Sequence, residues 1–179
     1  MKKAAAVANP AVEDITDRAL AQIQISYDRN GEHVFVESLA FENLQILDNF
    51  LINSNLNSNT SSSNNTNTSN GDSIAFYCRF RLYPEKRSLF QTKIVRCSRS
   101  QTSYLFDAKQ LNDFELTLEQ LNNHSIEILL YRVGTTKPAY KDIRIATVKY
   151  DLAGLNDAEE ISLKKPLDEC DPSSLIQVR

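Results

Sequence analysis

The fold class is decided by the stretch YCRFRLYP, residues 77–84. Apolar side chains at positions 78, 80 and 82 alternate with tyrosine or arginine at positions 77, 79, 81 and 83. This period of two is typical of a strand buried on one face, so Cys78, Phe80 and Leu82 are expected to enter a core. Pro84 ends the strand because it has no main-chain donor.

The residues that follow are predicted to return beside this strand. Residues 85–88 are the polar turn EKRS, and residues 90–96 are FQTKIVR, a segment with the β-branched residues that strands favour. The resulting hairpin would place Arg79, Arg81 and Lys93 on one outer surface. Such a surface is suited to anions.

The same alternation predicts further strands on both sides of this hairpin. They cover residues 23–27, 34–40, 103–108, 113–118, 125–133, 143–148 and 160–164. Asn30-Gly31 is a strong hairpin signal between the first two. Two points stay open: which of the segments 103–108 and 113–118 is central, and whether Ile143, Ile145 and Thr147 or the opposite register through Val148 faces the core. About eight short strands with this alternation predict an all-β, eight-stranded antiparallel β-sandwich.

The chain of 179 residues is expected to form one domain with flexible additions. Residues 53–70 are Asn, Ser or Thr apart from Leu56, so they cannot bury enough apolar surface to offset their ordering entropy. A long disordered loop insertion is predicted there. The sandwich is assigned to residues 20–165, with a lead-in at 1–19 and a C-terminal tail at 166–179.

Composition argues against several function classes. The chain has 20 basic and 23 acidic residues and a net charge of −3, so nucleic-acid binding is not expected. Three cysteines without a C-x-x-C spacing and two histidines indicate neither a disulfide framework nor a zinc site. With four isolated glycines and no nucleophile motif, neither an enzyme nor a cofactor is expected. Since no segment is as long and apolar as a membrane span, the interpretation is a cytoplasmic protein.

Several segments together resemble the C2 domain of synaptotagmin topology. They are Asn43-Leu44 before the long loop, Y-x-R-x-x-L-x-P at 77–84, F-Q-T-K-I-x-R at 90–96, and the Leu, Ile and Tyr spacing at 121–131. The segment 90–96 is the most specific, and the resemblance covers about residues 20–165. The basic strand and the missing acidic loops are also similar to the C2 domains of kibra-type scaffolds and of atypical, calcium-independent synaptotagmins. The sequence does not choose between these.

The resemblance implies a position for calcium ligands, and this chain departs from it. Calcium-binding C2 domains use aspartates from two loops, because the ion needs about 6–8 oxygen ligands. Here residues 75–77 replace the Asp-Pro-Tyr of the family, and Arg132 stands where a carboxylate is expected. Asp48, Asp72 and Asp142 remain near the loops, but these carboxylates are too few to surround a calcium ion. No metal site is therefore predicted.

The resemblance also implies an anion site on the strand face. Membrane-binding C2 domains hold a phosphoinositide headgroup with residues that match Tyr77, Arg79 and Lys93, with Gln91 replacing one lysine. Arginine suits phosphate because its planar fork donates two hydrogen bonds. The candidate lipid-binding or anion-binding residues are Tyr77, Arg79, Arg81, Lys86, Arg87, Lys93 and Arg96.

This basic face has three interpretations. The simplest is a solvated surface that binds nothing and limits aggregation. In the second, the chain is a non-catalytic, calcium-independent peripheral membrane module that binds anionic phospholipid in membrane trafficking or signalling scaffolding. In the third, it is a protein-interaction module that binds an acidic partner and has no lipid affinity. The sequence leaves the lipid species, the partner and the oligomeric state open.

Overall fold

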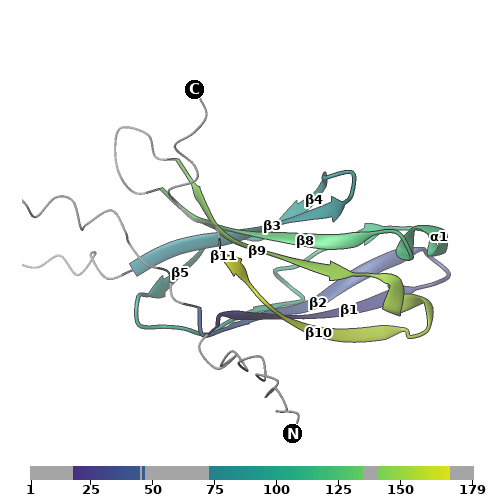
Figure 1. The fold of residues 1–179 in the computed structure, drawn as a ribbon, viewed down its shortest axis with the longest axis horizontal. Helices are drawn as coiled ribbons and strands as arrows, with labels where there is room; N and C mark the ends of the chain where they lie inside the picture. Colours follow the sequence, from purple (N-terminus) through teal and green to yellow (C-terminus); the bar gives the residue numbers. More distant parts are fainter. Residues whose placement is uncertain (1–17, 45, 47–72, 135–140, 170–179) are drawn as a thin grey trace, which may run out of the picture.

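The computed structural model describes residues 18–44, 46, 73–134 and 141–169. Within these ranges the chain forms eleven strands, the short helix α1 (Leu118–Leu121) and one turn of 3-10 helix (Ala153–Asn156). The strands make two antiparallel sheets that pack face to face (Figure 1). The all-β sandwich expected from the sequence is confirmed. The predicted insertion at 53–70 lies outside the described residues.

The first sheet has five strands and forms the lower layer in Figure 1. Its order is β10-β1-β2-β6, with β7 also pairing with β2. The strand bounds are β1 Leu20–Asp28, β2 His33–Glu42, β6 Tyr104–Asp107, β7 Asp113–Glu115 and β10 Glu160–Pro166. The hairpin expected around Asn30-Gly31 is the β1–β2 pair, and both segments 103–108 and 113–118 contribute strands that pair with β2.

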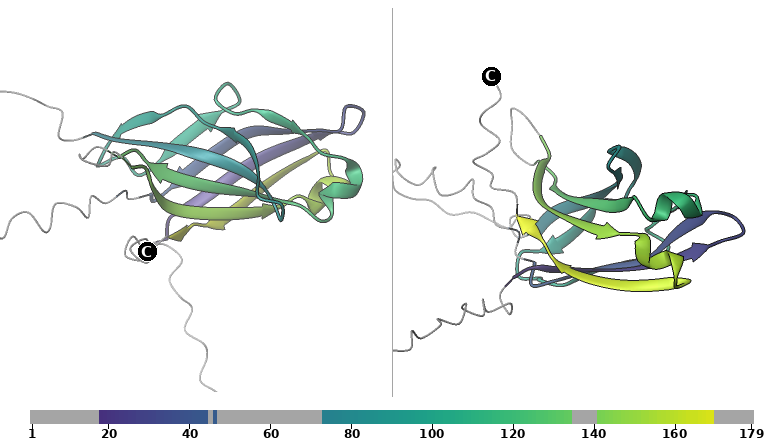
Figure 2. Two further views of the ribbon diagram at one scale, coloured as in Figure 1. Left: turned by 90° about the horizontal axis from the view of Figure 1, so that it is seen from above. Right: turned by 45° about the vertical axis from the view of Figure 1, so that its right-hand side comes forward.

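The second sheet has six strands and forms the upper layer. Its order is β11-β9-β8-β3-β4, with β5 also pairing with β3. The strand bounds are β3 Ser73–Tyr83, β4 Arg87–Gln91, β5 Val95–Ser98, β8 Ser125–Arg132, β9 Ile143–Asp151 and β11 Asp168–Glu169. Figure 2 shows the two layers from two further sides, with β3 and β8 in the middle of the second sheet.

The core lies between the two sheets and follows the predicted alternation. Cys78 and Phe80 are completely buried, and Leu82 is 1% exposed. Phe76 makes edge contacts with Tyr104 and with Phe106 of the first sheet, at ring-centroid distances of 4.7 and 6.0 Å. Burial of such aromatic and aliphatic groups is the main stabilising contribution of the sandwich.

Two local expectations need correction or completion. The segment 90–96 is not one strand, because Thr92–Ile94 separates β4 from β5. In β9 the register through Val148 is the correct one, with Ala146 and Tyr150 also facing the core. Before β8, helix α1 begins with a capping box between Thr117 and Gln120.

The contacts of the sandwich extend beyond residue 165. Strand β10 ends at Pro166, and Leu167 is buried, with its N–H donating to the carbonyl of Ala19. Asp168 and Glu169 then pair with β9. Among the described residues, the structure contains no helix of the length and apolar character needed to cross a membrane.

Candidate anion-binding site

The outer face of the second sheet has a stacked tyrosine pair at its centre. Tyr77 of β3 lies opposite Tyr131 of β8, which lies opposite Arg144 of β9. Directly opposite residues in neighbouring strands share a face, so these three side chains form one row. The two tyrosine rings are nearly parallel, with an interplanar angle of 9° and centroids 5.4 Å apart. Tyr77 is only 2% exposed although it lies outside the main core.

The hydroxyl of Tyr77 is held by Asp142. It donates to Oδ2 of Asp142 at 2.8 Å, and the main-chain N–H of Gly134 donates to Oδ1 at 3.1 Å. Burial and then the hydrogen bond to Asp142 raise the pKa of Tyr77 to about 12. The phenol therefore stays protonated at neutral pH, and its position below the surface is fixed.

Arg79 lies over this tyrosine pair. Its guanidinium carbon is 5.5 Å from the centroid of the Tyr77 ring and 5.0 Å from that of Tyr131, within the range of a cation–π contact. Its Nε donates to Oε1 of Gln91 at 3.0 Å. The two terminal nitrogens make no hydrogen bond to any described residue, and the side chain is exposed. The guanidinium is thus held in place with its outer edge open.

A β-bulge places Lys93 beside the same tyrosine. Thr92 exchanges hydrogen bonds with Cys78, through its own N–H at 2.9 Å and its Oγ1 at 3.0 Å, and Val95 lies opposite Phe76. Two residues, Lys93 and Ile94, therefore oppose the single residue Tyr77, which is the definition of a bulge. The cause is local. The N–H of Cys78 donates to the Thr92 hydroxyl, whereas in a continuous strand it would donate to a main-chain carbonyl.

By register, three cations share the outer face with Tyr77, and Lys93 lies in the bulge beside it; we call the four together the basic platform. Arg79 is two residues from Tyr77 along β3, and Arg96 lies opposite Ala75, two residues away in the other direction. None of the four forms an ion pair with a described residue, and the carboxylate of Asp142 accepts the tyrosine hydroxyl instead. The basic platform consists of Arg79, Lys93, Arg96 and Arg144.

Other cations of this face are already engaged. Arg81 forms an ion pair with Glu127, with Nη2 and Oε2 2.9 Å apart, and both side chains are largely buried. The ammonium nitrogen of Lys149 is 3.2 Å from the centroid of the Tyr83 ring. Arg81 is therefore neutralised by its own neighbour and is not part of the platform.

The turn between β3 and β4 is separate from the platform. Lys86 is exposed in this turn, and Arg87 lies opposite Leu82, whose side chain faces the core. Arg87 therefore does not share the face of Arg79. Between β3 and Lys86, Glu85 contacts Nε2 of His124 at 2.5 Å, which lowers the pKa of the Glu85 carboxyl.

The seven candidate residues thus fall into different positions. Arg79, Lys93 and Arg96 lie in the platform, whereas Tyr77 supports it from below and does not offer its hydroxyl to a ligand. Arg144 was missed, because it lies on this face only through a register shift in the β8–β9 pairing that a period of two does not predict. Strict alternation from Val148 and Ala146 would turn Arg144 toward the core, but the pairing passes from Leu130–Ala146 to Tyr131–Arg144 and skips Ile145, which brings Arg144 to the outer face.

Comparison with known proteins agrees with this architecture. No protein-family model matches the chain, and no curated protein sequence matches it. Among solved structures, it is similar to the third C2 domain of the KIAA1228 protein, with a TM-score of 0.55 and 15% identity over 93% of this chain and 95% of that domain. It is also similar to a C2 domain of RIM from Drosophila, with a TM-score of 0.51 and 16% identity over 84% of this chain and 98% of that domain. The chain has the C2 fold.

Within this C2 fold, the one described aspartate of the three considered for calcium is Asp142. Both of its carboxylate oxygens accept hydrogen bonds, one from Tyr77 and one from Gly134. Asp48 and Asp72 lie outside the described residues. In the part of the chain that the structure describes, no three His, Cys, Asp or Glu side chains gather as a metal-binding group.

Proposed function

We propose that this chain is a non-catalytic C2 module that binds anionic phospholipid, a phosphoinositide in particular, through the basic platform and without calcium. It would act at the cytoplasmic surface of a membrane in trafficking or signalling scaffolding. The observation that supports this proposal is the group of four cations without a described ion-pair partner around one buried tyrosine, in a chain whose net charge is −3. The positive charge is local, so attraction to an anionic surface depends on which face approaches.

The geometry of Arg79 supports phosphate as the ligand. Its planar guanidinium is held by Gln91 and by the two tyrosine rings, and its terminal nitrogens are open. A fixed fork loses little entropy when it donates two hydrogen bonds to phosphate oxygens. Lys93 beside it supplies a point charge of the kind that also binds phosphate.

The expected affinity is modest. A basic residue near an anionic leaflet contributes about 1 kcal/mol, so four contribute about 4 kcal/mol. Since about 4 kcal/mol corresponds to a dissociation constant in the millimolar range, charge alone gives weak and salt-sensitive binding. A second contribution is needed for stable docking.

Calcium is not expected to assist. The Asp142 carboxylate is occupied by two donors, and coordination of an ion would require both hydrogen bonds to be exchanged. An ion of this kind prefers several anionic oxygens at once.

The test is co-sedimentation of the full chain with vesicles. One set contains phosphatidylcholine alone and a second contains phosphatidylcholine with a phosphoinositide, each with calcium and with a calcium chelator. We expect pelleting with the phosphoinositide vesicles only, unchanged by the chelator and reduced by salt. Equal pelleting with neutral vesicles, or none with either, contradicts the proposal. Salt-sensitive capture of an acidic protein in the absence of lipid binding favours the protein-interaction alternative.

A further inference from the structure

The bulge that carries Lys93 also exposes an isoleucine. Ile94 is 53% exposed, and it directly follows an exposed lysine. In a continuous strand, the side chain opposite Tyr77 would share its face and pack in the row of Tyr131 and Arg144. Here one extra residue is present, and an apolar side chain remains in solvent at the border of the basic platform.

The protrusion is held rigidly on its N-terminal side. Thr92 is 2% exposed and exchanges two hydrogen bonds with Cys78, while its Oγ1 also donates to the carbonyl of Lys93 at 3.1 Å. On the other side, Val95 packs against the core and pairs with Phe76. A bulge fixed at both ends re-aims its side chains at low entropic cost.

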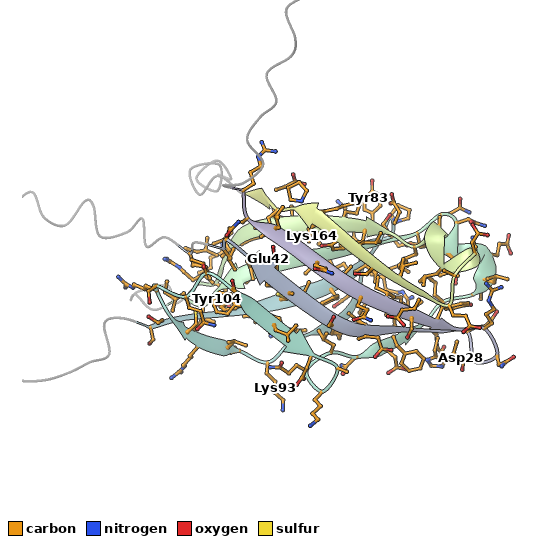
Figure 3. All side chains as sticks on the ribbon, turned by 90° about the horizontal axis from the view of Figure 1, so that it is seen from below. Asp28, Glu42, Tyr83, Lys93, Tyr104 and Lys164 are labelled. Atoms are coloured by element: carbon orange, nitrogen blue, oxygen red, sulfur yellow. The ribbon has the colours of Figure 1, made fainter. Side chains whose placement is uncertain are left out.

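The surroundings of Ile94 indicate what covers it. Lys93 precedes it, and Arg96 follows two positions later. On the neighbouring strand, Arg79 lies opposite Gln91, just before the bulge. Figure 3 shows Lys93 projecting away from the body of the sandwich. An apolar side chain bordered by cations fits the boundary between headgroups and acyl chains of an anionic bilayer. There the cations contact the headgroups and the apolar side chain contacts the acyl chains.

We infer that the Lys93–Ile94 bulge is a membrane-inserting wedge: Ile94 enters the acyl boundary of an anionic bilayer while the basic platform holds the headgroups. This inference rests on the proposed lipid binding and adds the docking orientation, with the edge formed by β4 and β5 against the membrane. Ile94 supplies the second contribution that charge alone lacks. Burial of an isoleucine side chain corresponds to a gain in affinity of about tenfold or more.

The absence of tryptophan from the chain makes a direct test possible. The Ile94→Trp variant carries a single tryptophan, which lies at the wedge. On phosphatidylcholine vesicles that contain a phosphoinositide, we expect a blue shift of its emission and quenching by brominated acyl chains. Leu105→Trp is the matched control, because Leu105 is 67% exposed but lies on the first sheet, opposite Ala40. Its emission is expected to stay unchanged.

A loss-of-function variant completes the test. Ile94→Ser is expected to weaken vesicle binding about tenfold and to leave binding of soluble inositol hexakisphosphate unchanged. If all variants pellet with the vesicles but the Ile94→Trp emission does not shift, the wedge is wrong and the proposed lipid binding stands. If no variant pellets, both are wrong. Circular dichroism establishes that each variant is folded.

Discussion

The outer faces of the two sheets differ in how their polar groups are satisfied. On the first sheet, polar side chains bond to one another: Gln22 donates to Ser162 at 3.0 Å and the ammonium of Lys164 is 2.6 Å from a Glu42 carboxylate oxygen, a pair labelled in Figure 3. On the second sheet, Arg79 of the basic platform donates to Gln91, but no carboxylate among the described residues pairs with a platform cation. Charge that is satisfied within a fold has little to offer a ligand, so a binding role is expected of the second face only.

The outer face of the second sheet also buries large side chains of its own. Tyr77 and Leu129 are 2% and 1% exposed, yet neither belongs to the core between the sheets. Leu129 lies opposite Arg79 on one side and Thr147 on the other. The second sheet therefore supports its cations on a small apolar and aromatic layer, which raises the local strength of electrostatic interactions.

The largest expected effect comes from breaking this layer. Leu129→Ala removes a buried side chain from the second outer face and should lower the free energy of unfolding by about 3 kcal/mol. Gln22→Ala, on the outer face of the first sheet, should change it by less than about 0.5 kcal/mol. Denaturant unfolding measures both. Equal effects would show that the second face has no packed layer of its own.

A smaller effect is expected for the tyrosine that supports Arg79. Tyr77→Phe removes the hydrogen bond to Asp142 and should cost about 1 kcal/mol. Because the pKa of Tyr77 is raised from 10.0 to about 12 on folding, the unfolded state loses its proton first as pH rises. The stabilising contribution is therefore complete below pH 10 and declines toward about pH 12.

The measurement is the free energy of unfolding of both proteins across that alkaline range. The wild type should lose stability more steeply than Tyr77→Phe between pH 10 and about 12. Parallel curves would mean that the phenol is not protected in the folded state.

A charge-neutralising pair compares the two faces directly. Glu127→Gln frees Arg81 on the second sheet, whereas Glu42→Gln frees Lys164 on the first. Each raises the net charge by the same amount. The first should strengthen binding to anionic vesicles about fivefold, from about 1 kcal/mol for one added basic group, and the second should leave it unchanged. An equal gain for both would assign binding to net charge and not to one face.

The smallest effect concerns the turn beyond the platform. The contact with His124 lowers the pKa of Glu85, so its stabilising contribution is present above the ordinary value of 4.5 and is lost as pH falls through the lower value in the folded state. Glu85→Gln should therefore lower the melting temperature slightly at about pH 6 and by less at about pH 3. A constant difference at both pH values would exclude this pairing. Vesicle binding should not change, since Glu85 is outside the platform.

Strand positions could be predicted from the sequence because each depends on a local period. The alternation at Cys78, Phe80 and Leu82 is sufficient to fix which side is buried. The interruption at Thr92 was not predictable in this way, since its cause is a side-chain hydroxyl that bonds to Cys78, and the β-branched composition of the segment favours an unbroken strand.

The candidate site was only partly predictable for the same reason. Local sequence shows that Arg79 and Arg81 share a face, but not that Glu127 neutralises Arg81 or that Asp142 holds Tyr77. Those partners are distant in sequence and meet only through strand register. Arg144 needed the register shift between Ala146 and Arg144 in β9, which no local alternation signals.

The central claim is tested most directly by reversing equal charge on two different faces. Arg79→Glu with Lys93→Glu alters the basic platform, and Arg29→Glu with Lys109→Glu makes the same change in net charge at exposed positions next to strands of the first sheet. In titrations with phosphoinositide vesicles, the first pair should lose affinity on the order of a hundredfold, while the second stays close to the wild type. Equal losses for the two pairs, or no loss for the first, would contradict the account.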